Sequence, residues 1–234
     1  FVFGFIFLWA RVAALAPGLA NFVTHAPVLS SLARWIAGVS PRRSLPRFSL
    51  ATFREWWDAR QQPDAASAET RPPVLLWVDT WSNHFEPGVA IAAVDELEQA
   101  GFRVVVPTQT LCCGRPLYDY GLLDRARRQL ADILEALRPA LRAGLPIVGL
   151  EPSCISVFRD ELRGLFPDDD DARRLAAQSH LLGEFLLSAR PPASSAGERP
   201  TLQRRAAAAA PPSALARRVA YAPPQGKKKA TVAE

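Results

Sequence analysis

Short apolar runs alternate with helical segments through the second half of the chain. Three runs have apolar residues at almost every position, at 74–78, 102–106 and 147–150. Such runs are typical of strands that are covered on both faces of a parallel sheet. Apolar residues at helical spacing predict helices at 89–100, 124–141, 158–165 and 172–187. Strands that alternate with helices form parallel sheets, so the sequence predicts an α/β fold with a small parallel sheet.

The rest of the chain divides into a helical N-terminal part, a linker and a tail. Residues 1–60 carry apolar stripes at helical spacing that prolines interrupt, which predicts a helical connector. Residues 61–73 are polar and rich in Pro and Ala, as is typical of a linker. Residues 190–234 are rich in Pro, Ala and Arg without periodicity, which predicts a disordered tail or a frameshifted gene end. One α/β unit is therefore predicted to occupy residues 74–189.

The positive charge of the chain is concentrated in its tail. The whole sequence has a net charge of +5, to which residues 190–234 contribute +7 and residues 1–189 contribute −2. A nucleic-acid surface needs basic residues clustered on the folded part of a protein. We therefore expect no nucleic-acid partner.

Cysteine usage and the first residues bear on where the protein works. The chain has three cysteines, too few for a secreted disulfide framework, which favours a reducing, cytoplasmic setting. The opening apolar run ends after ten residues at Arg11, which is too short to span a bilayer. We expect an amphipathic or buried helix there, with contact to the inner face of the membrane as the alternative.

Several common sequence features are absent. The sequence has no methionine, even at position 1, so we interpret it as a fragment of a longer protein. It has neither a Gly-x-Gly-x-x-Gly fingerprint nor a Walker loop, so FAD and NAD are not expected to bind this chain. It also has no ferredoxin-type run of cysteines, so clusters of that kind are not expected in this chain.

The cysteines are the strongest candidates for a functional site. Cys112 and Cys113 form an adjacent pair before Gly114, and Cys154 follows the third predicted strand. In parallel sheets the functional loops lie beyond the carboxyl ends of the strands, so these thiols and Thr80 are expected to converge. Adjacent cysteines rarely form a disulfide with each other, because the backbone would be strained.

Thiols in this arrangement are open to more than one role. Soft thiolates select iron–sulfur clusters, zinc or copper. A redox dithiol would need Cys154 as the partner that resolves a bond to the adjacent pair. Free cysteines are also among the most buried residue types, so a structural role stays open. We expect a cluster or redox role, with zinc and structural thiols as the alternatives.

Other polar residues near the cysteines are expected to cap helices, to pack or to order the cysteine loop. His84 is expected to cap or pack, although a neutral imidazole is a possible metal ligand. Tyr118 and Asp119 follow the cysteine pair and are expected to order its loop by hydrogen bonds. The acidic run at 168–171 lacks the spacing of a calcium loop, so we interpret it as the start of a helix.

Three segments of the chain closely resemble the cysteine-rich "CCG" domain of iron–sulfur oxidoreductases. These segments read VLLWVDTWSNHFEP, LCCGRPLYDYGLLDRA and PIVGLEPSCISVFRDEL. The family includes the heterodisulfide reductase B-type subunit and the glycolate oxidase iron–sulfur subunit. The three segments look most like the subgroup that is fused to an FAD-linked oxidase domain. With the segment 1–60, which resembles the connector of those proteins, the resemblance covers about residues 1–188.

The resemblance implies electron transfer in a flavin-linked oxidoreductase of the 2-hydroxy-acid dehydrogenase type, acting for example on D-lactate or glycolate. In this sequence Cys112, Cys113 and Cys154 match the family's metal ligands, which implies an iron–sulfur cluster of the 4Fe-4S type. The implied partners are a flavin oxidase domain or subunit and a ferredoxin-type cluster domain. FAD is then expected in a missing domain or partner, and the fragment is expected to be inactive alone.

The sequence departs from the family pattern at two positions. Thr80 stands where the first family cysteine would be, and Glu151 stands where a Cys-x-x-Cys motif would begin. A cubane cluster normally takes four thiolates, and oxygen from Asp79 or Glu151 is a poorer ligand. The second CCG repeat that the family commonly carries is also missing, because the pattern ends at about residue 189. The alternative is therefore a structural or docking domain with a degenerate cysteine site and no cluster.

Overall fold

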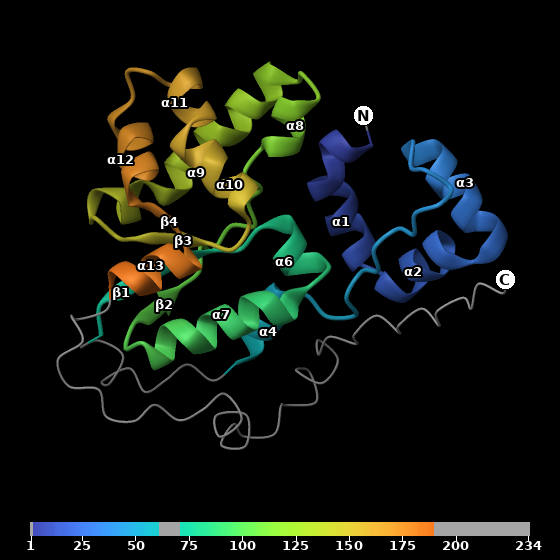
Figure 1. The fold of residues 1–234 in the computed structure, drawn as a ribbon, viewed down its shortest axis with the longest axis horizontal. Helices are drawn as coiled ribbons and strands as arrows, with labels where there is room; N and C mark the ends of the chain where they lie inside the picture. Colours follow the sequence, from blue (N-terminus) through green and yellow to red (C-terminus); the bar gives the residue numbers. More distant parts are fainter. Residues whose placement is uncertain (1, 61–70, 190–234) are drawn as a thin grey trace, which may run out of the picture.

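A computed structural model describes residues 2–60 and 71–189 as an α/β fold around one sheet (Figure 1). Its strands are β1 Pro73–Trp77, β2 Arg103–Val105, β3 Ile147–Gly149 and β4 Ser179–Leu181. All three pairings are parallel and the strand order is β2-β1-β3-β4, which confirms the predicted fold class. Most of the predicted linker and the whole predicted tail lie outside the described residues.

Helices make up most of the described chain. The N-terminal part contains η1 Phe3–Phe5, α1 Ile6–Ala14, α2 Pro17–His25, α3 Pro27–Ala37 and α4 Phe53–Ala59. The helices between the strands are α6 Thr80–His84, α7 Pro87–Gln99, α8 Arg115–Asp119 and α9 Leu123–Arg142. Those after β3 are α10 Pro152–Arg159, α11 Glu161–Leu165, α12 Asp170–Gln178 and α13 Leu182–Ser188. None of the helices in the described ranges combines the length and the apolar composition that a membrane span requires.

The sheet is covered on both faces, which explains its continuous apolar strands. Leu75 and Trp77 of β1 face a core that is completed by α9, α10 and α12. Val74 and Leu76 of the same strand face a second core against α4, α7 and α13. Side chains of a strand alternate between its two faces, so both cores need apolar residues from β1. Burying each of these large side chains contributes about 2 kcal/mol to stability.

The end of the α/β unit differs from the sequence prediction. The sequence predicts one helix over 172–187, but the structure has α12, then the short strand β4, then α13. The backbone leaves the helix at Ser179, whose buried hydroxyl donates to the carbonyl of Leu175. β4 then pairs with β3 in the register Val148 to His180. Tertiary pairing has overridden local helix propensity over these residues.

The N-terminal segment contributes to the core through α4. Phe53 is fully buried against the α7 face of the sheet, as expected for an aromatic residue that packs rather than binds. Thr52 caps α4, because its hydroxyl accepts from Glu55 N–H while the Glu55 carboxylate accepts from Thr52 N–H. By contrast, α1, α2 and α3 lie together at one side of the molecule (Figure 1).

Candidate functional site

The three cysteines meet beyond the carboxyl ends of the strands, as the topology predicts. Cys112 and Cys113 lie in the loop between β2 and α8, and Cys154 lies in the first turn of α10 after β3. All three side chains are free thiols and are buried, with exposures of 6%, 3% and 3%. The site thus lies among α6, α9 and α10, next to the start of α8.

The thiols are connected by a row of hydrogen-bonding contacts. The Sγ atoms of Cys113 and Cys154 are 2.9 Å apart. Cys113 also bonds to the thiol of Cys112, which in turn bonds to the side chain of Thr80. The row therefore runs from Thr80 through the adjacent pair to Cys154, and it brings together residues that are far apart in sequence.

The surroundings keep two of the thiols protonated at neutral pH. The hydrogen bond to Cys113 and burial raise the pKa of Cys112 well above its usual value. The hydrogen bond from Cys112 lowers the pKa of Cys113, but the contact with Cys154 and burial outweigh it and raise that pKa as well. Protonated thiols are weak nucleophiles, so this pair is not set up for thiol chemistry without another charge nearby.

Backbone N–H groups point at the sulfur atoms. The N–H of Gly114 donates to Cys112, and the N–H of Arg115 donates to Cys113. Gly114 has φ of 80°, which L side chains rarely adopt, so this turn requires glycine. Hydrogen bonds to sulfur favour thiolate and tune the reduction potential of iron–sulfur centres.

Two side chains that the sequence did not single out hold the cysteine loop in place. Gln129 of α9 donates through Nε2 to the carbonyl oxygen of Cys112 at 2.7 Å. Arg115 pairs with Asp119 at 3.0 Å and also contacts the carboxylate of Glu161. The Arg115–Asp119 pair lies within α8, so the expected ordering of the cysteine loop by Asp119 stays a prediction. A polar residue on a long amphipathic helix carries no signal for such a contact, so Gln129 was not predictable.

The candidate oxygen ligands are engaged elsewhere. Asp79 caps α6, and its carboxylate accepts from the N–H groups of Trp81 and Ser82 at 2.7 and 3.0 Å. This cap positions Thr80 beside the cysteines. Glu151 caps α10 in the same way and accepts from the hydroxyl of Ser153 at 3.1 Å.

His84 packs rather than faces the thiols, in line with its expected role. Its ring is buried and contacts the Asn83 amide at 3.1 Å, while Nδ1 is buried without a hydrogen-bond partner among the described residues. Burial and the positive charge of Arg11 lower the pKa of His84 to about 4, although Glu55 opposes the shift. The acidic run at 168–171 likewise starts a helix, because Asp169 caps α12.

The donor chemistry fits a thiolate-bound metal centre with an incomplete ligand set. Three soft sulfur donors converge, as an iron–sulfur centre requires. No three His, Cys, Asp or Glu side chains of the described residues are arranged around a single metal position. Cys112, Cys113 and Cys154 therefore do not surround one metal position in this structure, and their role as metal ligands stays a prediction.

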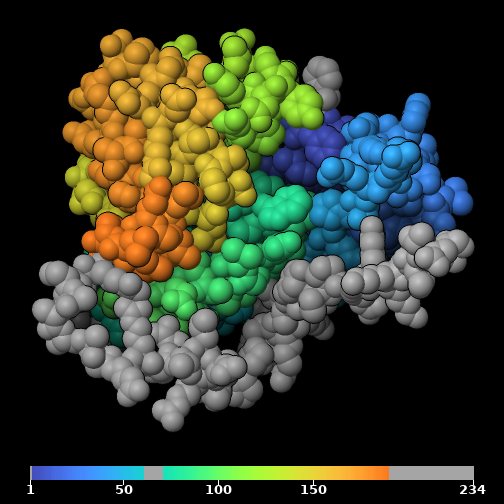
Figure 2. Space-filling model, viewed as in Figure 1, coloured from blue at the N-terminus to red at the C-terminus, as the bar shows by residue number. Residues whose placement is uncertain are grey.

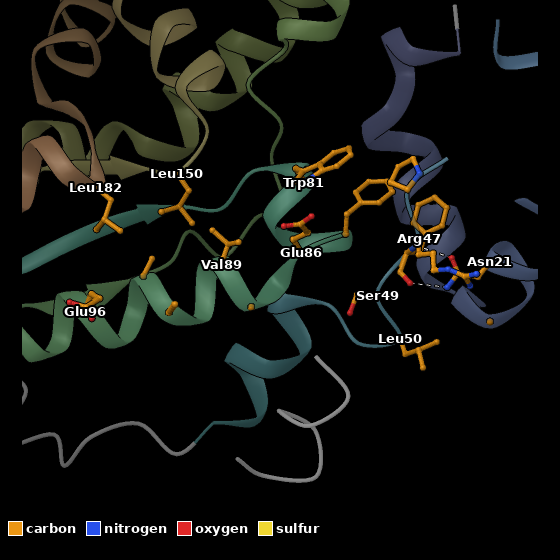
Figure 3. A pocket seen from close by; sticks show the side chains of 17 residues that line it. Asn21, Arg47, Ser49, Leu50, Trp81, Glu86, Val89, Glu96, Leu150 and Leu182 are labelled. Carbon is orange, nitrogen blue, oxygen red and sulfur yellow. Dashed lines mark hydrogen bonds between the residues drawn. The ribbon is translucent and has the colours of Figure 1, made fainter. Parts of the chain in front are cut away.

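A hollow of about 450 Å³ borders the cysteines and is lined by Cys112 and Gln129 together with Arg11 of α1. A second hollow, of about 1260 Å³, is lined by Trp81 of α6 and by none of the cysteines (Figure 3). Its wall is mostly apolar and includes Val89, Leu150 and Leu182, as labelled in Figure 3.

The sequence is similar to two kinds of curated proteins. It is 29% identical over 124 residues to one of the subunits of anaerobic glycerol-3-phosphate dehydrogenase from Escherichia coli K12, covering 53% of this chain and 31% of that protein. It is 30% identical over 119 residues to lactate utilization protein A from Bacillus subtilis 168, covering 49% of this chain and 48% of that protein. For lactate utilization protein A from Exiguobacterium, the identity is 32% over 117 residues, covering 50% and 46%.

The matches cover only part of each relative. The chain spans about a third to a half of the length of these relatives. The sequence matches no protein-family model and no solved structure. The comparisons therefore establish similarity over half of this chain to a dehydrogenase subunit and to lactate utilization proteins.

Proposed function

We propose that residues 74–189 form a CCG-type electron-transfer domain of a flavin-linked oxidoreductase. In this proposal Cys112, Cys113 and Cys154 hold an iron–sulfur centre, of the 4Fe-4S type that the resemblance implies. The observation that carries it is the contact of three thiols at the carboxyl ends of parallel strands. Similarity to a dehydrogenase subunit and to lactate utilization proteins supports the oxidoreductase class.

The residues around the thiols have distinct roles in this proposal. When bound, the centre would supply one-electron acceptance and donation. The N–H groups of Gly114 and Arg115 stabilise negative charge on the sulfur atoms. Gln129 fixes the loop through the Cys112 carbonyl, and Asp79 places Thr80 beside Cys112 through its helix cap.

The partners follow from the same assignment. The chain has no flavin-binding fingerprint, so the flavin would belong to another domain or subunit, and a ferredoxin-type cluster domain would pass electrons onward. Residues 1–60 would connect such domains, with residues 61–73 as a linker, and residues 190–234 would be a tail or a frameshifted end. A 2-hydroxy acid such as D-lactate or glycolate is the proposed substrate class of the complete enzyme. The free thiols favour a cytoplasmic location.

Reduction of the anaerobically reconstituted protein tests this function. Dithionite should bleach its visible absorption and produce an electron paramagnetic resonance signal, and an added oxidant should reverse both changes. Cys113→Ser should abolish or alter the signal, because that thiol contacts both other cysteines. Ser153→Ala changes the residue beside Cys154 without removing a sulfur and should leave the signal intact. A wild-type signal that survives in Cys113→Ser would contradict the assignment.

A docking domain without a cluster is the second candidate. The raised pKa values of Cys112 and Cys113 and the oxygen side chain of Thr80 in the row favour it. Under this alternative the reconstituted wild type shows no reversible signal. Serine replacements of the cysteines then change neither folding nor electron transfer in the complete enzyme.

A further inference from the structure

The segment from α1 to α3 exposes an unusual amount of apolar side chain. It carries twelve of the eighteen exposed large apolar residues of the described chain. We call this the connector surface and define it by Trp9, Leu15, Leu19, Phe22, Val28 and Trp35. Exposure reaches 87% at Leu15 and 78% at Trp35. Exposed large apolar side chains gathered on one segment of the chain indicate a site of interaction.

The exposed apolar residues recur at helical spacing. Apolar residues repeat every three or four positions from α1 into α2, and all of them are exposed: Leu8, Val12, Leu15, Leu19 and Phe22. The buried positions of these helices are small, such as Ala10 in α1 and Ser30 in α3. In an isolated globular protein, the apolar stripe of an amphipathic helix faces the core. Because this stripe is exposed, we expect another molecule to cover it.

The positive charge of residues 1–54 indicates what kind of molecule covers the connector surface. Residues 1–54 contain six arginines and no aspartate or glutamate. Arg42, Arg43 and Arg47 follow α3, are exposed, and form no ion pair among the described residues. Two copies of this surface would repel each other, because both carry arginines. The tail at 190–234 is also basic, so it would be repelled by this surface as well. The complementary occupant is therefore anionic as well as apolar.

We propose that the connector surface binds the anionic headgroup region of a lipid bilayer. The helices have 9, 9 and 11 residues, so they are too short to span the bilayer and would lie in its interface. Trp9 and Trp35 suit the boundary between headgroups and acyl chains, and the arginines suit anionic headgroups. Figure 2 shows this part of the chain at one edge of the molecule, away from α9 to α13. The proposal does not depend on the iron–sulfur centre.

Vesicle sedimentation of the full chain tests the proposal. Phosphatidylcholine vesicles that contain phosphatidylglycerol should bind the protein, and pure phosphatidylcholine vesicles should bind it at least about tenfold more weakly. The double variant Trp9→Ser/Trp35→Ser should lose most of the binding. Leu123→Ser/Leu187→Ser, which changes exposed apolar residues outside α1–α3, should keep it. Circular dichroism would verify that each variant is folded.

The basic tail requires its own control, because it also attracts anionic lipid. A chain with Lys227, Lys228 and Lys229 changed to Gln should still require Trp9 and Trp35 for its remaining binding. The proposal would be overturned if the lysine variant lost its binding to the vesicles while the tryptophan variant kept it. A folded protein that does not bind the anionic vesicles would also overturn it, whether that protein dimerises or binds an acidic protein through α1–α3.

Discussion

At the scale of single residues, Thr80 is the side chain that most directly limits the proposed centre. It bonds to the thiol of Cys112 at the position where a further sulfur ligand would complete the set. Thr80→Cys should therefore raise the iron retained per chain in the presence of a chelator, because thiolate is a better ligand for iron–sulfur centres than hydroxyl. Thr24→Cys adds a thiol on α2 and serves as the control. Equal retention in both variants would contradict the role given to this position.

His84 makes the stability of the fold depend on pH. Its pKa falls from 6.5 to about 4 on folding, so the unfolded chain binds the proton first as the pH drops. The contribution of His84 to the free energy of unfolding is fully present above pH 6.5. It declines towards pH 4, by at most about 3 kcal/mol. Urea unfolding at neutral pH and near pH 4 should show a smaller decline in His84→Gln than in the wild type. Identical declines would show that the histidine is not held neutral in the fold.

At the scale of elements, Asp171 fastens α12 to α9. Its buried carboxylate accepts from Arg138 and Arg142 of α9 at 3.1 Å each and from Arg174 at 2.7 Å. Asp171→Asn should lower the free energy of unfolding by about 1–2 kcal/mol, a modest value because the arginines are partly exposed. The neighbouring Asp170 is exposed and pairs with Arg173, so Asp170→Asn should change stability by less than about 0.5 kcal/mol. Chemical denaturation of the two variants measures the difference, and equal losses would refute the fastening role.

The elements differ in how far their sequence specifies them. β1 and α9 were predictable because continuous apolar runs and long helical stripes are strong periodic signals. β4 was not, because Ser179–Leu181 is short and depends on pairing with β3. The convergence of the cysteines followed from strand topology alone. The row from Thr80 to Cys154 and the contact of Gln129 arise from tertiary packing, and their role as a centre stays a prediction.

At the scale of the whole molecule, the cysteines and the connector surface occupy different parts of one chain. The thiols lie in the loop before α8 and in the first turn of α10. The helices α1–α3, whose exposed side chains include large apolar residues, lie at one side of the molecule (Figures 1 and 2). The hollow that borders Cys112 is lined in part by Arg11, so α1 also borders the site. This arrangement would let a partner or a membrane be held by one region while electrons pass through the other.

The iron and acid-labile sulfide content per chain tests the central claim most directly. It should be measured on anaerobically reconstituted wild type beside the variant Cys112→Ser/Cys113→Ser/Cys154→Ser, with both proteins shown to be folded. The account predicts stoichiometric iron and sulfide in the wild type and their loss in the variant. Iron in the folded wild type no higher than in the variant would contradict it and leave the docking domain as the better description.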